Sequence, residues 1–220
     1  MRLSVLALLV VPGLAQAQVV TIGAHGGVNV ASNDGGSSTV KPVAGASLDV
    51  TLFGQLALRV EAEYSESGVH LAAGSGSATM ATDYSLGYLA VPVNLRYDLS
   101  TGTVPLYLFA GTTLGALLFA TQSEGTTSTD VKSQLRPVDV SLDLGGGIGY
   151  RISPNLAVLC DVRFSYGLLD DVKQDAVLAL DSWQQRAVKV VLGVTYTFNP
   201  LSPSVPTMPG MPFPMAAPEE

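Results

Sequence analysis

Two alternating runs joined by a short turn decide the fold: "VDVSLDLGGGIGY" (Val138–Tyr150) and "LAVLCDVRFSY" (Leu156–Tyr166). In each run, apolar side chains at every second position alternate with aspartate, arginine, serine or glycine. A period of two over this length is the pattern of a half-buried β-strand. The glycines between Gly145 and Gly149 match neither phosphate-binding fingerprint, because Tyr150 stands where a further spaced glycine is required and no Lys-Ser/Thr pair follows. The stretch therefore predicts two long paired strands and no nucleotide site.

The same period recurs along the chain. Eight alternating runs occupy 19–31, 41–52, 55–67, 84–98, 104–120, 137–152, 155–168 and 186–199. They exceed the roughly five or six residues of a typical soluble strand and suit strands that cross a bilayer at a tilt. Short connections ("FGQ", "LSTGT", "SPN") alternate with long ones rich in Gly, Ser, Thr and Asp. We therefore expect an all-β, eight-stranded antiparallel up-and-down barrel, with short turns at one end and long loops at the other.

Alternation alone does not separate a membrane barrel from a soluble lipocalin-like one, which would be polar outside. The aromatics of the apolar face favour the membrane, because they fall at the strand ends like two interfacial girdles. They are Tyr97, Tyr150, Tyr196 and Phe198 at the short-turn end, and Tyr64, Phe164 and Tyr166 at the long-loop end. The polar face combines Gly, Ser and Thr with charges of both signs, which suits the packed inside of a narrow transmembrane barrel.

The polar face supplies the candidate site residues. We expect a lumen network of Arg59, Glu61, Glu63, Arg96, Asp143, Asp161, Arg163 and Lys189, joined by Asp49, because buried charges require partners. Gly145, Gly147 and Gly149 share the polar parity, and we expect them to leave room on the inner wall for long Arg and Glu side chains from neighbouring strands.

The two ends of the chain differ from this pattern. Residues 1–17 have an early arginine, an apolar run and an Ala-Gln-Ala site, which predicts a secretory signal peptide with the barrel domain over 18–199. Residues 200–220 are rich in proline and predict a disordered periplasmic tail. The single cysteine, Cys160, allows no internal disulfide, and a net charge of −7 argues against a nucleic-acid partner.

The chain resembles the small outer-membrane β-barrel proteins of Gram-negative bacteria, the porin family / outer membrane beta-barrel domain group related to OmpX and the OmpA barrel. The resemblance covers about 19–199 and rests on "GAHGGVNVAS", "LRVEAEYSESG", "YLAVPVNLRYDL", "PLYLFAGTTLG", the stretch from Asp143 to Leu168, and a last strand ending in Phe198. It implies a monomer exported to the outer membrane, surrounded by its lipid and inserted by the barrel-assembly machinery. The proline-rich tail departs from the family pattern, in which the terminal aromatic commonly ends the chain.

We expect a non-enzymatic protein with no cofactor, no metal and no catalytic residues, acting structurally or through surface contacts of its long loops, whose ligand the sequence does not name. An eight-stranded barrel is just wide enough for its own side chains, which argues against a wide pore. Three alternatives stay open: a narrow channel or small-solute binding barrel, a lipid-modifying barrel enzyme using a serine with His70 and Asp83, and an exported soluble lipocalin-like binder.

Overall fold

A computed structural model of the chain describes residues 19–32, 37–71, 81–125, 127–169 and 186–198. The elements are β1 (Val20–Ser32), β2 (Ser37–Phe53), β3 (Leu56–Leu71), β4 (Thr82–Ser100), β5 (Leu106–Glu124), β6 (Thr127–Asp130), the short 3₁₀ helix η1 (Lys132–Gln134), β7 (Val138–Arg151), β8 (Leu156–Gly167) and β9 (Arg186–Phe198). No helix in these ranges is long and apolar enough to cross a membrane. The expected signal peptide and the proline-rich tail lie outside the described residues.

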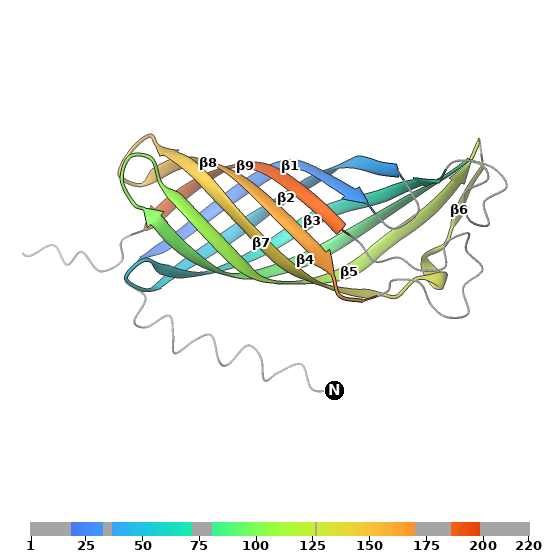
Figure 1. Cartoon of the computed structure of the whole chain (residues 1–220), viewed down its shortest axis with the longest axis horizontal. Helices are drawn as coiled ribbons and strands as arrows, with labels where there is room; N and C mark the ends of the chain where they lie inside the picture. The colour runs from blue at the N-terminus through green and yellow to red at the C-terminus, as the bar shows by residue number, and fades with distance from the viewer. Residues whose placement is uncertain (1–18, 33–36, 72–80, 126, 170–185, 199–220) are drawn as a thin grey trace, which may run out of the picture.

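Eight of the strands close into a ring in which all neighbouring pairs are antiparallel (Figure 1). Each strand pairs with the next one along the chain, β5 pairs with β7 once the short β6 is passed, and β9 returns to β1. Val20 at the start of β1 lies opposite Phe198 at the end of β9, so the first and last strands begin and end at the short-turn end. The expected eight-stranded antiparallel up-and-down barrel is confirmed.

The two faces of the wall differ in polarity, as the alternation requires. On β7, Leu142, Leu144 and Ile148 are 47 %, 63 % and 51 % exposed, whereas Ser141 and Asp143 are 7 % and 4 % exposed. The outside of the barrel is thus apolar and its inside polar. An apolar outer surface is stable in contact with lipid, whereas a soluble lipocalin-like barrel is polar outside and apolar inside.

A proline lies in the middle of β4, where a closed sheet normally disfavours it. Pro92 is buried on the inner face and pairs with Thr113 of β5. The ladder between β3 and β4 runs from Leu56 to Val60 and resumes only at Glu63, so it is interrupted opposite the proline. The missing amide hydrogen of Pro92 therefore falls where no ladder bond is made.

The strands extend beyond the expected limits at the long-loop end. β3 continues to Leu71, β4 begins at Thr82 and β5 continues to Glu124. The segment 121–136, expected to be a loop, instead contains β6 and η1, because a turn at Gly125 (φ +57°) folds it back onto β5. Figure 1 shows these strands projecting past the ends of β1, β8 and β9.

The inner wall changes from charged to apolar in this projecting part. Buried apolar side chains pack together there, and we call them the inner apolar cluster: Val69, Leu71, Tyr84, Leu86, Tyr88, Leu117, Ala120, Val131 and Leu135. Val131 and Leu135 come from the segment that folds back after β6, and each is 2 % exposed. The cluster therefore gives the projecting strands a small hydrophobic core of their own.

Candidate functional site: the barrel lumen

The eight predicted lumen residues all lie on the inner wall. They come from five strands: Arg59, Glu61 and Glu63 from β3, Arg96 from β4, Asp143 from β7, Asp161 and Arg163 from β8, and Lys189 from β9. Seven are at most 7 % exposed, and the side chain of the eighth, Arg96, is 12 % exposed. Charges buried this deeply are tolerated only when they are paired and hydrogen-bonded.

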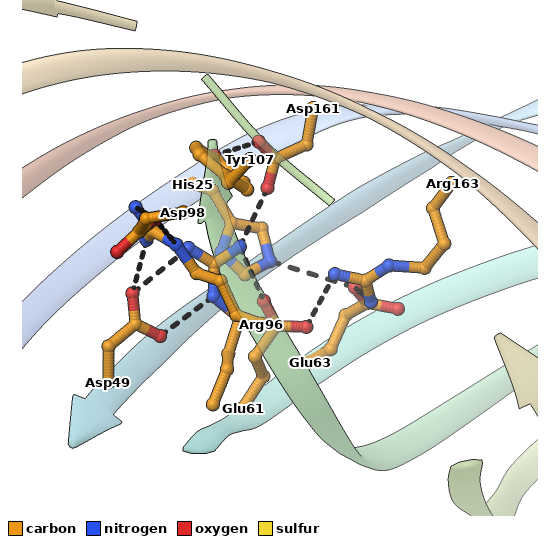
Figure 2. Close-up of polar contacts among 10 residues, drawn as sticks. His25, Asp49, Glu61, Glu63, Arg96, Asp98, Tyr107, Asp161 and Arg163 are labelled. Carbon is orange, nitrogen blue, oxygen red and sulfur yellow. Dashed lines mark hydrogen bonds and ion pairs between the residues drawn. The ribbon is translucent and has the colours of Figure 1, made fainter. Parts of the chain in front are cut away.

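The half of this network near the short turns is organised around Asp49 of β2 (Figure 2). Arg59 Nε and Nη2 donate to the two oxygens of Asp49 at 2.7 and 3.0 Å, a bidentate pair. Arg96 Nη1 donates to the same carboxylate at 2.8 Å, and Arg96 Nη2 lies 2.7 Å from Asp98 Oδ1. Arg59 Nη1 reaches across the lumen to Asp161 Oδ2 at 2.9 Å. Two arginines and three aspartates thus alternate from the mouth of the barrel inward.

The other half is organised around Glu61 and Glu63. Arg163 Nη2 lies 2.7 Å from Glu61 Oε2, and Arg163 Nη1 lies 3.6 Å from Glu63 Oε2. Lys189 Nζ donates to Glu63 Oε1. Arg59 Nη1, 4.0 Å from Glu61 Oε1, joins the two halves. We call the whole set the ion ladder: Asp98, Arg96, Asp49, Arg59, Asp161, Glu61, Arg163, Glu63 and Lys189.

A histidine joins the ladder from β1. His25 Nε2 lies 3.6 Å from Glu63 Oε2, and the ligand atoms of His25, Glu61 and Glu63 lie within 4.8 Å of one another. One imidazole and two carboxylates are a donor set that zinc accepts. Both carboxylates already pair with Arg163, and Lys189 also binds Glu63, so a metal ion here would have to displace a buried cation. We assign His25 to the ladder on this ground.

Asp143 stands apart from the ladder. The ion pairs among the described residues do not reach it, although the sequence groups it with the other lumen charges. It accepts hydrogen bonds from the hydroxyls of Thr113 on β5 and Ser165 on β8, the latter at 2.6 Å. Its neighbours on the adjacent strands are short hydroxyl side chains, because the register places Thr113 near it on one side and Ser165 directly opposite on the other.

Two aromatic rings outside the predicted set of lumen residues lie among the arginines. Arg96 Cζ is 3.8 Å from the ring centre of Tyr107, and Arg59 Cζ is 5.2 and 5.8 Å from the ring centres of Tyr107 and Phe109. Such contacts stabilise a cation over the ring face. The Tyr107 hydroxyl also donates to Asp161. The strict alternation within "PLYLFAGTTLG" is the signal that would have placed both rings inside.

The lumen glycines make room for these rings. Gly145 lies opposite Phe109 and Gly147 opposite Tyr107 on the neighbouring strand. A Cβ atom at Gly147 would collide with the Tyr107 ring and the Asp161 carboxylate, and one at Gly145 would collide with the Phe109 ring. The expected occupants were Arg and Glu chains. The aromatic rings take the space instead because cross-strand neighbours are the closest groups on one face of a sheet, and the arginines lie on those rings. At Gly149, the third glycine, a Cβ would meet Leu159 and Pro105.

The side chains leave separate spaces along the lumen. A vestibule of about 230 Å³ at the short-turn end is lined by Asp49, Arg96, Asp98 and Arg151, among others. A space of about 20 Å³ lies beside His25, and one of about 40 Å³ lies near the long-loop end. The ion ladder passes between them. The smaller spaces have room for one to a few water molecules, since a water needs roughly 10–15 Å³ of such volume.

The predicted interfacial aromatics lie on the outer face near strand ends, except Tyr64, which lies in the middle of β3 because that strand continues to Leu71. Tyr97, Tyr150, Tyr196, Phe198 and Phe164 are 43–56 % exposed. Tyr64 and Tyr166 are half-buried, and the Tyr64 hydroxyl donates to Glu66 at 2.6 Å. Phe53, at the β2–β3 turn, is 71 % exposed and extends the short-turn group, although it was not among the predicted residues.

The residues considered for a lipid-modifying enzyme lie on the projecting strands. His70 Nδ1 is 2.7 Å from Asp83 Oδ1, and Ser37 is the register partner of His70 on β2. No hydrogen bond joins Ser37 to His70 within the described structure. The His70 and Asp83 side chains are 43 % and 66 % exposed, which is the environment of an ordinary cross-strand pair.

Comparison with known proteins agrees with this geometry. The family described as "Outer membrane protein beta-barrel domain" matches residues 15–171. The chain belongs to this family. Membership places the protein in the outer membrane. No curated protein matches the chain in sequence.

Solved structures show the same fold at low sequence identity. Neisserial surface protein A is 19 % identical with a TM-score of 0.54, and the match covers 81 % of this chain and 97 % of that one. A major outer membrane protein from Thermus thermophilus is 12 % identical with a TM-score of 0.55, covering 81 % and 99 %. The attachment invasion locus protein Ail of Yersinia pestis is 17 % identical with a TM-score of 0.50, covering 83 % and 100 %.

Proposed function

We propose that this protein is a non-enzymatic outer-membrane barrel. It has a structural role in the outer membrane and makes surface contacts through its extracellular end. The observation that carries the proposal is the filled lumen: buried ion pairs of the ion ladder join opposite walls of the barrel, and the inner apolar cluster packs on the inner side of the projecting strands. A lumen held by buried ion pairs between opposite walls favours a rigid plug over an open pore.

The projecting strands supply the surface for contacts. They continue the sheet of the barrel past the ends of β1, β8 and β9, and the inner apolar cluster packs on their inner face. Two of the similar structures carry names that refer to a surface protein and to attachment, which is consistent with this role. Export by the predicted signal peptide and insertion by the barrel-assembly machinery belong to the same proposal.

Planar-bilayer recording and complementation of a deletion strain test it. We expect no stable open conductance from the purified barrel. We also expect the full chain to restore resistance of the strain to detergents and its adhesion to cells or matrix. A variant with 121–130 replaced by a two-residue Asn-Gly turn should restore resistance but not adhesion. A large steady conductance, or a change in lipid composition that depends on His70, would contradict the proposal.

A narrow channel is the second candidate, and the vestibule at the periplasmic mouth favours it. The vestibule, the small space beside His25 and the space near the extracellular end follow one another along the barrel, separated by the ladder. If the ladder is a gate, Arg59→Met should increase single-channel openings several-fold relative to Arg151→Met, a substitution at the mouth. Equal recordings from both variants would remove this candidate.

A further inference from the structure

A groove on the outer face of the barrel lies apart from the lumen and from the projecting strands. Its volume is about 730 Å³, which falls within the roughly 300–1,000 Å³ of small-molecule sites. It extends over β7, β8, β9 and β1, and it therefore crosses the β9–β1 pair that closes the ring. The strand register aligns its outward-facing side chains in two rows, and the row nearer the short turns is Tyr150, Val158, Val194 and Ala24.

Small side chains make the groove, because they interrupt a wall of larger ones. On β1, Ile22 and Val28 are exposed on the outer face, whereas the two outward positions between them are Ala24 and Gly26. A Cβ atom at Gly26 would meet only the Val43 carbonyl oxygen across the strands, at 3.7 Å, so the space in front of this glycine is open. The second row of the groove is Ile148, Cys160, Leu192 and Gly26.

The lining of the groove is almost entirely apolar. Its outward-facing side chains carry no charge, and Tyr150 has the one hydroxyl group among them. Tyr150 belongs to the interfacial aromatics at the short-turn end, and such rings lie at the level of the lipid head groups. The groove thus begins at the membrane interface and continues along the wall toward Leu192 and Gly26. This polarity matches an amphipathic molecule with a polar head and an apolar chain.

Two occupants compete for an apolar groove inside a membrane: a lipid chain and a second copy of the barrel. A symmetric dimer brings the same surface of both subunits together, so it would place groove against groove and enclose a larger void. Association within a bilayer depends on van der Waals packing, and atoms that line a void lose those contacts. A flexible hydrocarbon chain instead contacts the floor and both sides of the groove, whereas on the convex wall elsewhere it is contacted on one side. The shape of the groove therefore favours lipid.

We propose that this groove binds one acyl chain of a phospholipid from the membrane leaflet at the short-turn end. The head group lies at the level of Tyr150, and the chain lies over Ala24, Gly26 and Cys160. The bound lipid covers the β9–β1 pair, which joins the first and last strands of the barrel. Lipid binding at this wall does not depend on what the extracellular end contacts.

Native mass spectrometry of the full-length barrel tests for the bound lipid. After reconstitution in vesicles of phosphatidylethanolamine and phosphatidylglycerol and extraction in a mild detergent, each chain should carry one phospholipid. Gly26→Leu and Ala24→Leu fill the groove and should each lower the lipid-bound fraction about 10-fold or more, since a methylene-sized change in an apolar pocket is worth about 10- to 200-fold. The gel shift of unboiled samples confirms that the variants fold.

A matched substitution on another wall serves as the control. Ala110→Leu adds the same side chain on the outer face of β5, on the far side of the ring from β1, and should leave the lipid-bound fraction unchanged. In intact vesicles, the motionally restricted signal of a phosphatidylcholine spin-labelled on its acyl chain should decrease in Ala24→Leu and not in Ala110→Leu. Equal lipid signals in these two variants would overturn the proposal. A dimer that Ala24→Leu dissociates would overturn it as well, because a second copy would then occupy the groove.

Discussion

Arg59 holds the two halves of the ion ladder together, and its removal is the strongest test of the lumen structure. Arg59→Met keeps most of the buried aliphatic part of the side chain but removes the positive charge and all the N–H hydrogen-bond donors. It deprives Asp49 of a bidentate partner and Asp161 of its arginine. Removing one partner of a buried ion pair costs about 3–5 kcal/mol because the remaining charge stays buried. We expect the free energy of unfolding to fall by that amount.

The contribution of the Asp49 pair is isolated by a double-mutant cycle. Asp49→Asn alone removes charge-assisted hydrogen bonds and should cost about 1.5–3 kcal/mol. In the double variant neither charge of the pair remains, so the loss should be smaller than the sum by about 1–3 kcal/mol. Arg151→Met, an exposed arginine at the mouth, is the control and should change stability by no more than about 0.5 kcal/mol.

Urea unfolding in lipid vesicles, followed by the gel shift between folded and unfolded forms, measures the wild-type protein and the four variants. Additivity of the two single substitutions within about 0.5 kcal/mol would refute the reasoning, because residues in direct contact are expected to couple. A loss in Arg59→Met no larger than that of Arg151→Met would refute it as well, since the buried arginine would then carry no more energy than the exposed one.

The same unfolding assay tests three other features. Gly147→Ala should cost about 1–3 kcal/mol because its methyl group meets a ring and a carboxylate, whereas Gly102→Ala, in open space, should be neutral. Leu192→Arg, on the outer face and 66 % exposed, should cost about 2–4 kcal/mol near the bilayer centre, and Leu99→Arg at the short-turn end about 0–1 kcal/mol. Equal losses would contradict a lipid-facing wall. Leu135→Ala in the inner apolar cluster should cost about 2–5 kcal/mol, and a neutral result would show that the cluster does not pack.

The faces of the strands were predictable from the sequence, because side-chain direction in a strand has a period of two. Arg59, Glu61 and Glu63 could be assigned to one wall without knowing any partner. Their pairing across the lumen could not be predicted in the same way. The contact between Arg59 and Asp161 joins β3 to β8, and it depends on the tilt and stagger of the ring, which no local pattern encodes.

The long-loop end was least predictable. Val131 and Leu135 stand in a polar stretch, and only the return of the chain over β5 gives these two side chains an apolar environment. Leu86 and Tyr88 lie on the inner wall although most apolar residues of the strands face outward, because the inner face of the projecting strands packs as a core. The period of two is the same in both regions, so it does not show where the inner face changes from polar to apolar.

The cross-lumen pairs also bear on how the barrel reaches one final arrangement. Lys189 and Glu63, like Arg59 and Asp161, lie far apart in the chain and on strands that are not neighbours in the ring. They meet only after β9 has joined β1. A shift of one residue in the register of any strand pair would turn an inward-facing charge toward the lipid. A misregistered or incompletely closed ring leaves the lumen charges unpaired, and only the correct closure pairs them. The lumen charges thus destabilise wrongly closed barrels relative to the native one.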